Sequence, residues 1–157
     1  MGKKKKYCMG SRGEGWVLLQ FVLFGILLAT TQVDRVDLPG WIQYTGYIFL
    51  VIGGIFGTGG VLNLGRNLTP FPRPKESSSL ITHGLYQFVR HPIYTGVLFG
   101  TLGWSLIISN SIGLVFVVIL FLFFDAKSRR EERWLVERYP EYAAYRKNVK
   151  KLIPWIY

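Results

Sequence analysis

Four long apolar runs restrict the fold of this chain more than any other feature of its sequence. They cover residues 16–33, 41–64, 92–109 and 111–124, and polar segments separate them. A helix needs about 20 mostly apolar residues to cross a bilayer, whereas β-strands are usually much shorter. The last run is short for a span, but good helix formers continue it to residue 139 without a breaker. The sequence therefore predicts an all-α integral membrane protein with about four transmembrane helices.

The C-terminal part of the chain is expected to extend this bundle with cytoplasmic helices. Residues 125–139 continue the fourth run as one helix that leaves the membrane, and Pro140 ends it. Residues 141–151 place Tyr142, Tyr145 and Val149 on one side and Arg146, Lys147 and Lys150 on others, which predicts an amphipathic helix at the membrane surface. Residues 1–15 are rich in Lys and Gly and predict a flexible basic tail. Residues 16–157 are then expected to form a single domain.

The basic residues predict how the protein is oriented. Only Arg35, of the 19 Lys and Arg residues, lies between the first two apolar runs; the other 18 lie before the first run, between the second and third, or after the fourth. Cytoplasmic loops carry the excess of Lys and Arg in membrane proteins, so both termini are expected to be cytoplasmic. The net charge of +10 fits the anionic lipids of the cytoplasmic leaflet. Membrane lipids, and not nucleic acid, are therefore the expected partners of this charge.

The second apolar run is unusually rich in glycine. It contains Gly46, Gly53, Gly54, Gly57, Gly59 and Gly60. In lipid, small residues spaced four apart allow two helix backbones to approach closely. We expect this run to pack tightly against another helix; the alternative is a ligand that rests on bare backbone.

A dense group of polar and aromatic residues precedes the third run. It comprises Gly84, Tyr86, Arg90, His91, Pro92, Tyr94 and Gly96. Ionisable groups at membrane depth are costly and usually have a function. Pro92 suits the first turn of a helix, and the free N–H groups of that turn suit an anion. In the alternative interpretation, Arg90 reaches a lipid phosphate and His91 only caps the helix.

A second polar cluster, Arg129 to Arg133, lies on the extension of the fourth run. Since the third and fourth runs form a hairpin, this cluster should return to the start of the third run. We expect one of Glu131 and Glu132 to face a pocket there and the other to pair with an arginine. The alternative is a solvated helix face with ion pairs four residues apart. No Cys/His metal-ligand set, glycine-rich phosphate loop or Ser-His-Asp order occurs in the sequence.

The two clusters together suit a zwitterionic ligand that also carries a sulfonium. The glutamates offer an anion to an ammonium group, Arg90 and the helix start offer cations and N–H donors to a carboxylate, and tyrosines suit a sulfonium. The motif order in this chain resembles the isoprenylcysteine carboxyl methyltransferase family, including its prokaryotic relatives and the related phospholipid methyltransferases. The motifs are Asn67-Leu-Thr-Pro70, Leu80-Ile-Thr-His-Gly-Leu-Tyr86, Arg90-His-Pro-Ile-Tyr94, Glu131-Glu132 and Tyr139-Pro-Glu-Tyr-Ala-Ala-Tyr145, within residues 41–157.

The resemblance implies an integral membrane enzyme that binds S-adenosylmethionine without a Rossmann domain. The cofactor would lie in a cytoplasm-facing pocket, and a lipophilic substrate would enter from the bilayer. The residues implied in cofactor binding are Gly84, Tyr86, His91, Pro92, Tyr94, Glu131 and Glu132, with Arg90 and His91 as catalytic candidates. One departure is His83-Gly84-Leu85, because the family more often has a small polar residue before the glycine and a proline after it. The length implies a minimal core without the extra N-terminal helices of eukaryotic members.

The expected reaction is in-line transfer of a methyl group to a lipophilic acceptor. An isoprenylcysteine-type carboxylate, a phospholipid amine and a small thiol all remain open as acceptors. A carboxylate or thiolate needs no strong base, whereas an amine would give its proton to His91 or a glutamate. Arg90 would orient an anionic acceptor or the cofactor carboxylate. Two alternatives are a sterol-type membrane reductase that uses NADPH and a non-enzymatic scaffold whose basic tail docks on anionic lipid.

Overall fold

The described part of the chain folds into five α-helices, of which the last is short. The computed structural model describes residues 13–31, 35–71 and 78–157, so the expected basic tail lies almost wholly outside the described residues. The helices are α1 (Glu14–Thr30), α2 (Gly40–Leu64), α3 (Pro92–Ile107), α4 (Ser111–Arg138) and α5 (Tyr142–Asn148). Short 3-10 turns follow α2 and precede α3, at Gly65–Asn67 and Gly84–Gln87. Within the described ranges there is no strand, only one isolated bridge, and the all-α prediction is confirmed.

Two of these helices have the length and composition of a membrane span. They are α2, with its 3-10 extension to Asn67, and α4. The helices α1 and α3 are apolar but shorter, at 17 and 16 residues. As expected, α4 is a single helix that runs from the fourth apolar run through the charged cluster. Asn110 caps its start by accepting from the amide of Gly113, and the helix ends one residue before Tyr139.

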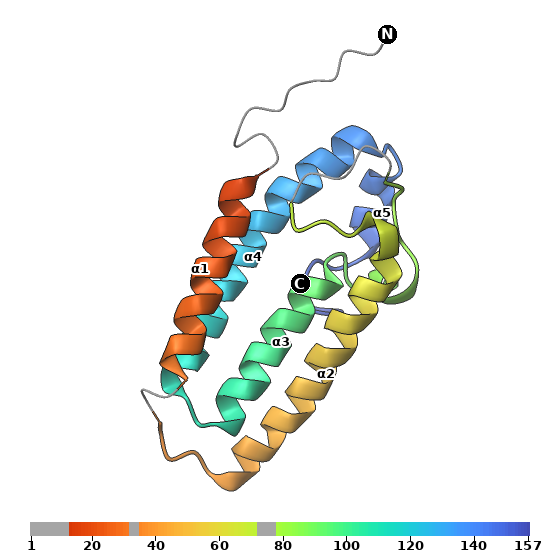
Figure 1. Cartoon of the computed structure of the whole chain (residues 1–157). Coiled ribbons are helices and arrows are strands. Elements are labelled where there is room, and N and C mark those ends of the chain that lie inside the picture. Colours follow the sequence, from red (N-terminus) through yellow and green to blue (C-terminus); the bar gives the residue numbers. More distant parts are fainter. Residues whose placement is uncertain (1–12, 32–34, 72–77) are drawn as a thin grey trace.

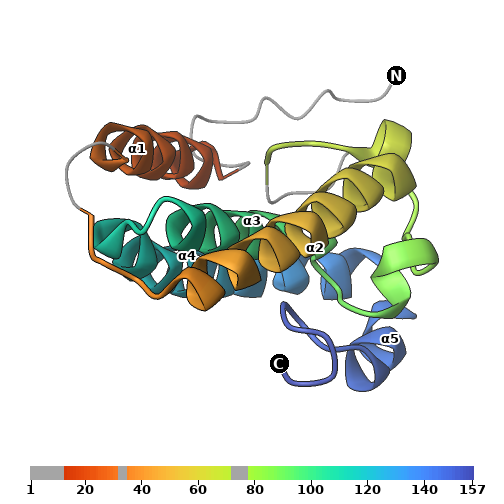
Figure 2. The ribbon, with the colours of Figure 1, turned by 90° about the horizontal axis from the view of Figure 1, so that it is seen from below.

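The four long helices alternate in direction and lie in the order α1, α4, α3, α2 (Figure 1). This arrangement brings the start of α3, the end of α2 and the end of α4 to the same end of the bundle. The helix α5 and the C-terminal segment, residues 149–157, are also at this end. Figure 2 shows them together on the opposite side of the molecule from α1. The hairpin of α3 and α4 therefore places both polar clusters of the sequence at one end.

Glycines allow α2 and α3 to pack with their backbones in close contact. A Cβ atom added at Gly53 would lie 2.8 Å from the Cα atom of Gly100 and closer still to its nitrogen. One added at Gly103 would lie 3.0 Å from the Cα atom of Leu50. Real Cβ atoms do not approach backbone atoms this closely, so the two backbones touch. The prediction of tight helix packing at the glycine-rich run is confirmed.

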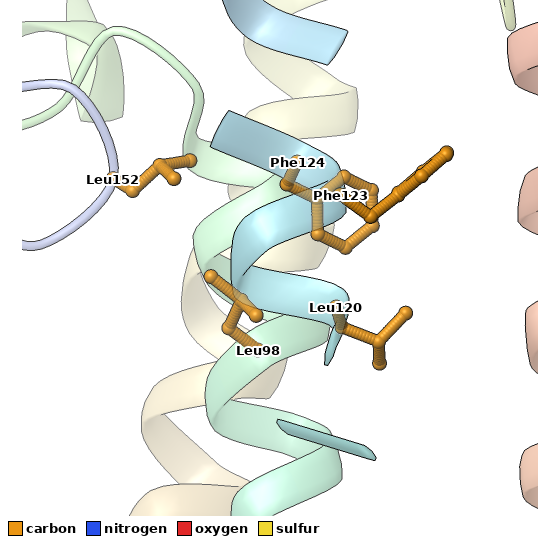
Figure 3. Close-up of a cluster of buried hydrophobic side chains, with 5 residues drawn as sticks. All are labelled: Leu98, Leu120, Phe123, Phe124 and Leu152. Atoms are coloured by element: carbon orange, nitrogen blue, oxygen red, sulfur yellow. The ribbon is translucent and has the colours of Figure 1, made fainter. Parts of the chain in front are cut away.

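A small apolar core joins α3, α4 and the C-terminal segment. Leu98 of α3 packs with three residues of α4 and with Leu152 of the C-terminal segment (Figure 3). The α4 residues are Leu120, Phe123 and Phe124. Leu120, Phe124 and Leu152 are fully buried. The C-terminal segment is therefore part of the packed structure, in contact with the middle of the bundle.

The C-terminal segment differs from the amphipathic helix expected over residues 141–151. The helix α5 ends at Asn148, and the backbone then becomes extended from Val149. Lys150 accepts from the amide of Arg90 at 2.8 Å, and Lys151 accepts from the amide of His91 at 3.2 Å. These bonds satisfy two amides that precede the first turn of α3. Backbone pairing thus replaces the last turn of the expected helix.

Asp125 anchors the same segment through its side chain. Its carboxylate accepts from Lys151 Nζ at 2.6 Å, Tyr157 Oη at 2.7 Å and Arg129 Nε at 2.8 Å. Burial alone raises the pKa of Asp125, but the hydrogen bonds from Lys151, Arg129 and Tyr157 outweigh it and lower the pKa to about 2. Asp125 therefore stays ionised at any physiological pH and binds the C-terminal segment to α4.

We expect Gly53→Ala to destabilise the protein and Gly54→Ala to leave it unchanged. Gly53 faces the backbone of Gly100, whereas a Cβ atom at Gly54 meets nothing within 4 Å. Overpacking of this kind costs about 1–3 kcal/mol. Thermal unfolding of the detergent-purified variants measures the difference. Equal midpoints for the two variants would contradict the close contact between α2 and α3.

We expect acid to release the C-terminal segment through Asp125. The folded-state pKa of Asp125 is lowered from 3.8 to about 2. Its contribution to stability is therefore complete above pH 4 and disappears as the pH falls toward 2. The thermal midpoint of the wild type should fall more steeply over this range than that of Asp125→Asn. Parallel pH profiles for the two proteins would show that the carboxylate does not anchor the segment.

Candidate functional site

A cavity of about 320 Å³ opens where the polar clusters meet. Its walls come from the start of α3, the charged part of α4, α5 and the loop on both sides of residues 72–77. Arg90, His91 and Glu131 make one part of the wall polar, while Ile93 and Leu135 are among its apolar residues. Pockets for small molecules have about this size and this mixture of surfaces. The cavity is therefore the candidate functional site.

His91 is held from three directions at the start of α3. It is 7% exposed and directly precedes Pro92, the first residue of the helix. Its Nε2 atom lies 3.1 Å from Glu132 Oε1, and its Nδ1 atom lies 3.7 Å from Glu131 Oε2. The ring stacks on Tyr94 with centroids 5.3 Å apart. The imidazole therefore has a fixed orientation between the two glutamates.

Glu131 is the carboxylate that faces the cavity. Tyr94 donates to its Oε2 atom at 2.9 Å, and the Tyr94 ring stacks on Phe124 with centroids 4.6 Å apart. A quarter of the Glu131 side chain, 26%, remains exposed. A carboxylate has about four lone-pair sites, and within the described residues only Tyr94 donates a hydrogen bond to it. Glu131 can therefore accept further donors from a ligand.

Glu132, by contrast, has protein partners at both of its carboxylate oxygens. It is 2% exposed and accepts from Arg90 Nε at 2.8 Å, while Arg146 Nε lies 3.3 Å from its other oxygen. Burial raises the pKa of Glu132, but the hydrogen bonds and charges of His91 and Arg90 outweigh it and lower the pKa to about 2. The expectation that one glutamate faces the pocket and the other pairs with an arginine agrees with these contacts.

Arg90 is fixed by α5 as well as by α4. Its Nη1 atom donates to the carbonyl oxygens of Val149 and Arg146. The guanidinium therefore satisfies two carbonyls near the end of α5 and one buried carboxylate. Part of Arg90 still lies on the cavity wall.

The other residues singled out in the sequence lie close to the cavity in different ways. Tyr86 lines it, whereas Gly84 and Pro92 do not. Gly84 has a φ of 63°, a left-handed conformation that suits glycine, and Asn63 occupies the space where a side chain would stand. Asn63 Oδ1 also accepts from the amide of Leu85 at 2.9 Å. These two positions shape the loop before α3 and the start of that helix.

Sequence reasoning missed several polar residues of the cavity, of which Tyr142 and Lys127 are the most buried. Tyr142 is 2% exposed, and its hydroxyl has no hydrogen-bond partner among the described residues. Burial and then the charge of Glu132 raise its pKa, so the hydroxyl stays a donor. Lys127 is also 2% exposed and donates to Gln20 Oε1 at 2.6 Å. The sequence offered one sign of this contact, because the partner of Lys127, Gln20, is a strongly polar residue inside an apolar run.

The cavity combines three kinds of surface that one ligand could use together. Glu131 offers an anion, Arg90 offers a cation, and Tyr142 offers a buried hydroxyl without a partner. An unsatisfied buried hydroxyl is costly unless something in the cavity accepts from it or donates to it. The arrangement suits a zwitterionic ligand with an apolar or aromatic part.

Comparison with known proteins gives a consistent family. The phospholipid methyltransferase family matches residues 41–142. Protein-S-isoprenylcysteine O-methyltransferase A of Arabidopsis thaliana is 28% identical over 120 residues, or 74% of this chain and 61% of the relative. The probable protein-S-isoprenylcysteine O-methyltransferase of Oryza sativa subsp. japonica is 31% identical, over 74% of this chain and 63% of the relative. The human protein-S-isoprenylcysteine O-methyltransferase is 28% identical, over 74% of this chain and 42% of the relative.

A solved structure has the same fold. It is the eukaryotic intramembrane Ras methyltransferase ICMT, with a TM-score of 0.67 and 22% identity over 98% of this chain and 58% of that one. The chain thus spans about three fifths of the length of its plant relatives. The two apolar helices long enough to cross a membrane, together with the membrane-enzyme relatives, support an integral membrane protein. The chain belongs to the phospholipid methyltransferase family, and its resemblance to isoprenylcysteine carboxyl methyltransferases is confirmed.

Proposed function

We propose that this protein is a membrane methyltransferase that uses S-adenosylmethionine to methylate a lipophilic acceptor. The observation that carries the proposal is one cavity that combines Glu131, Arg90, an unpartnered Tyr142 hydroxyl and an apolar wall. The relatives are methyltransferases by name, which supports the same class of reaction.

The residues of the cavity fit S-adenosylmethionine group by group. Glu131 would accept from the ammonium, and Arg90 or the Tyr142 hydroxyl would donate to the carboxylate. The aromatic rings of Tyr86 and Tyr94 lie on the wall and would face the sulfonium. We propose Glu131, Tyr86, Tyr94 and His91 as direct contacts. Glu132, Gly84 and Pro92 would act by holding these contacts in place.

The chain's own residues would chiefly position the reactants and exclude water. S-adenosylmethionine, when bound, supplies an electrophilic methyl group. The apolar wall around Ile93, Val97 and Phe124 would receive the hydrocarbon part of the acceptor and keep water away from the reacting atoms. Arg90 would orient an anionic acceptor, and fixed alignment of this kind lowers a barrier without a strong base. For an amine acceptor, His91 lies within the cavity to take the proton.

We also propose the topology that the basic residues predict. All four apolar helices, including the shorter α1 and α3, would cross the membrane as one domain over residues 16–157. Since 18 of 19 Lys and Arg residues fall on one side, both termini and the cavity would face the cytoplasm. The acceptor's lipophilic part would then come from the bilayer and the cofactor from the cytoplasm. An isoprenylcysteine-type carboxylate, a phospholipid amine and a small thiol are the acceptor classes to test.

Glu131→Gln should weaken S-adenosylmethionine binding by about 10-fold or more, because a hydrogen bond to a charged group contributes about 1.5–3 kcal/mol. Glu137→Gln is the matched control, since it makes the same charge change on an exposed residue of the same helix. Isothermal titration of detergent-purified protein measures both affinities. If the two variants bind alike, Glu131 does not hold the cofactor; if the wild type does not bind, the proposed function is wrong.

Tyr142→Phe should weaken cofactor binding by about 5-fold without lowering the thermal midpoint. The variant removes only a hydroxyl that has no partner among the described residues, and a neutral hydrogen bond to a ligand is worth about 1 kcal/mol. Tyr145→Phe is the contrast, because the Tyr145 hydroxyl donates to the Tyr86 carbonyl and its loss should lower the midpoint. Unchanged binding by Tyr142→Phe would exclude the hydroxyl as a ligand contact.

A further inference from the structure

A second cavity, of about 450 Å³, lies beside the charged part of α4. The two cavities share only Arg90. Arg129, Arg133, Arg146 and Lys151 also line the second cavity, together with Glu132 and Tyr157. Nothing in the proposed methyl transfer uses this space.

The charges around the second cavity do not balance. Five cationic side chains line it, and among the described residues the only side-chain carboxylates within ion-pair distance of them are Glu132 and Asp125, which leaves a formal side-chain excess of five minus two, or +3. Arg133 has no hydrogen bond or ion pair to any described residue. It lies one turn from Arg129 on α4, and like charges four residues apart destabilise a helix. The cavity therefore concentrates positive charge that an anion would neutralise.

An apolar groove of about 250 Å³ continues from this basic cavity along α3 and α4. All of its lining residues are apolar, among them Leu102 and Val118 in the middle of the helices. The two spaces meet at the C-terminal segment: Lys151 lines the cavity, and the next residue, Leu152, lines the groove. The rings of Tyr157 and Phe121, one from each space, have centroids 5.7 Å apart. A charged site and an apolar groove thus adjoin.

In the topology proposed above, both spaces would lie at the cytoplasmic membrane interface. Trp155 and Ile156, next to the cavity residue Tyr157, are 80% and 75% exposed. Exposed aromatic residues of this kind lie at the level of lipid headgroups in membrane proteins. The groove runs from there toward the hydrocarbon region, because its walls are the apolar parts of α3 and α4.

We propose that the basic cavity and the groove together bind one anionic glycerophospholipid, with its phosphate among the arginines and an acyl chain in the groove. A soluble phosphate would satisfy the cations but would leave the groove empty. A zwitterionic lipid would bring a second cation into a space that already carries excess positive charge. An anionic lipid matches both parts, and neutralising Arg129, Arg133 and Arg146 should also stabilise the fold.

The test compares lipid binding by two arginine variants. Purified, delipidated full-length protein is titrated with phosphatidylglycerol and with phosphatidylcholine, and native mass spectrometry counts the bound lipids. Phosphatidylglycerol should bind the wild type at least about 5-fold more tightly. Arg133→Gln should lose about 5-fold in this affinity, since one basic residue near a lipid surface contributes about 1 kcal/mol. Arg130→Gln, which makes the same charge change at a residue that stacks on Trp134 and lines neither cavity, should bind like the wild type.

Several results would overturn the proposal. Equal binding of the two lipids, or an equal loss of affinity in both variants, would mean that the net positive charge attracts lipid without a specific binding site. Displacement of phosphatidylglycerol by an equal concentration of glycerol phosphate would identify a soluble phosphate ligand instead. Neither residue lines the first cavity, so S-adenosylmethionine affinity should be unchanged in both variants, and failure of one proposal leaves the other testable.

Discussion

The candidate site depends on one buried carboxylate, that of Glu132. It joins Arg90 and His91 at the start of α3 to Arg146 of α5. Burying a charge is costly unless it is paired and fully hydrogen-bonded, and here three side chains supply the compensation. Because Glu132 takes up these partners, Glu131 is left to face the cavity. Neighbouring glutamates thus have separate tasks, and removal of either Arg90 or His91 would leave a buried charge with fewer partners.

The glycine interface sets the position from which this cluster is built. It continues along α2 to Gly60, where an added Cβ atom would lie 3.1 Å from Pro92 Cγ. The contact between the α2 and α3 backbones therefore reaches the first residue of α3, directly after His91. Apolar packing in the bundle fixes where α3 begins, and the polar residues before it are placed as a consequence. The pairing of residues 90 and 91 with 150 and 151 closes the site from the other side.

Much of this arrangement could be predicted from the sequence. Apolar run lengths gave the helices to within a few residues, and the α3–α4 hairpin brought Arg90 and His91 to Glu132. The sequence could not say which glutamate faces inward, because adjacent helix positions differ by a rotation that only packing decides. The pairing beside Lys150 uses backbone groups and leaves no side-chain pattern. The sequence placed Tyr142 on the aromatic side of an amphipathic surface helix, because the cavity against which it is buried is formed by distant segments.

The pairing of Arg90 with the carbonyl of Val149 has a consequence for biosynthesis. These residues are 59 positions apart in the chain. The guanidinium and the start of α3 are therefore made and inserted well before their partners leave the ribosome. Until then, water or lipid phosphate must solvate Arg90. The pocket is the last part of the molecule to form, so a chain stalled after the fourth helix would sit in the membrane without a site for its ligand.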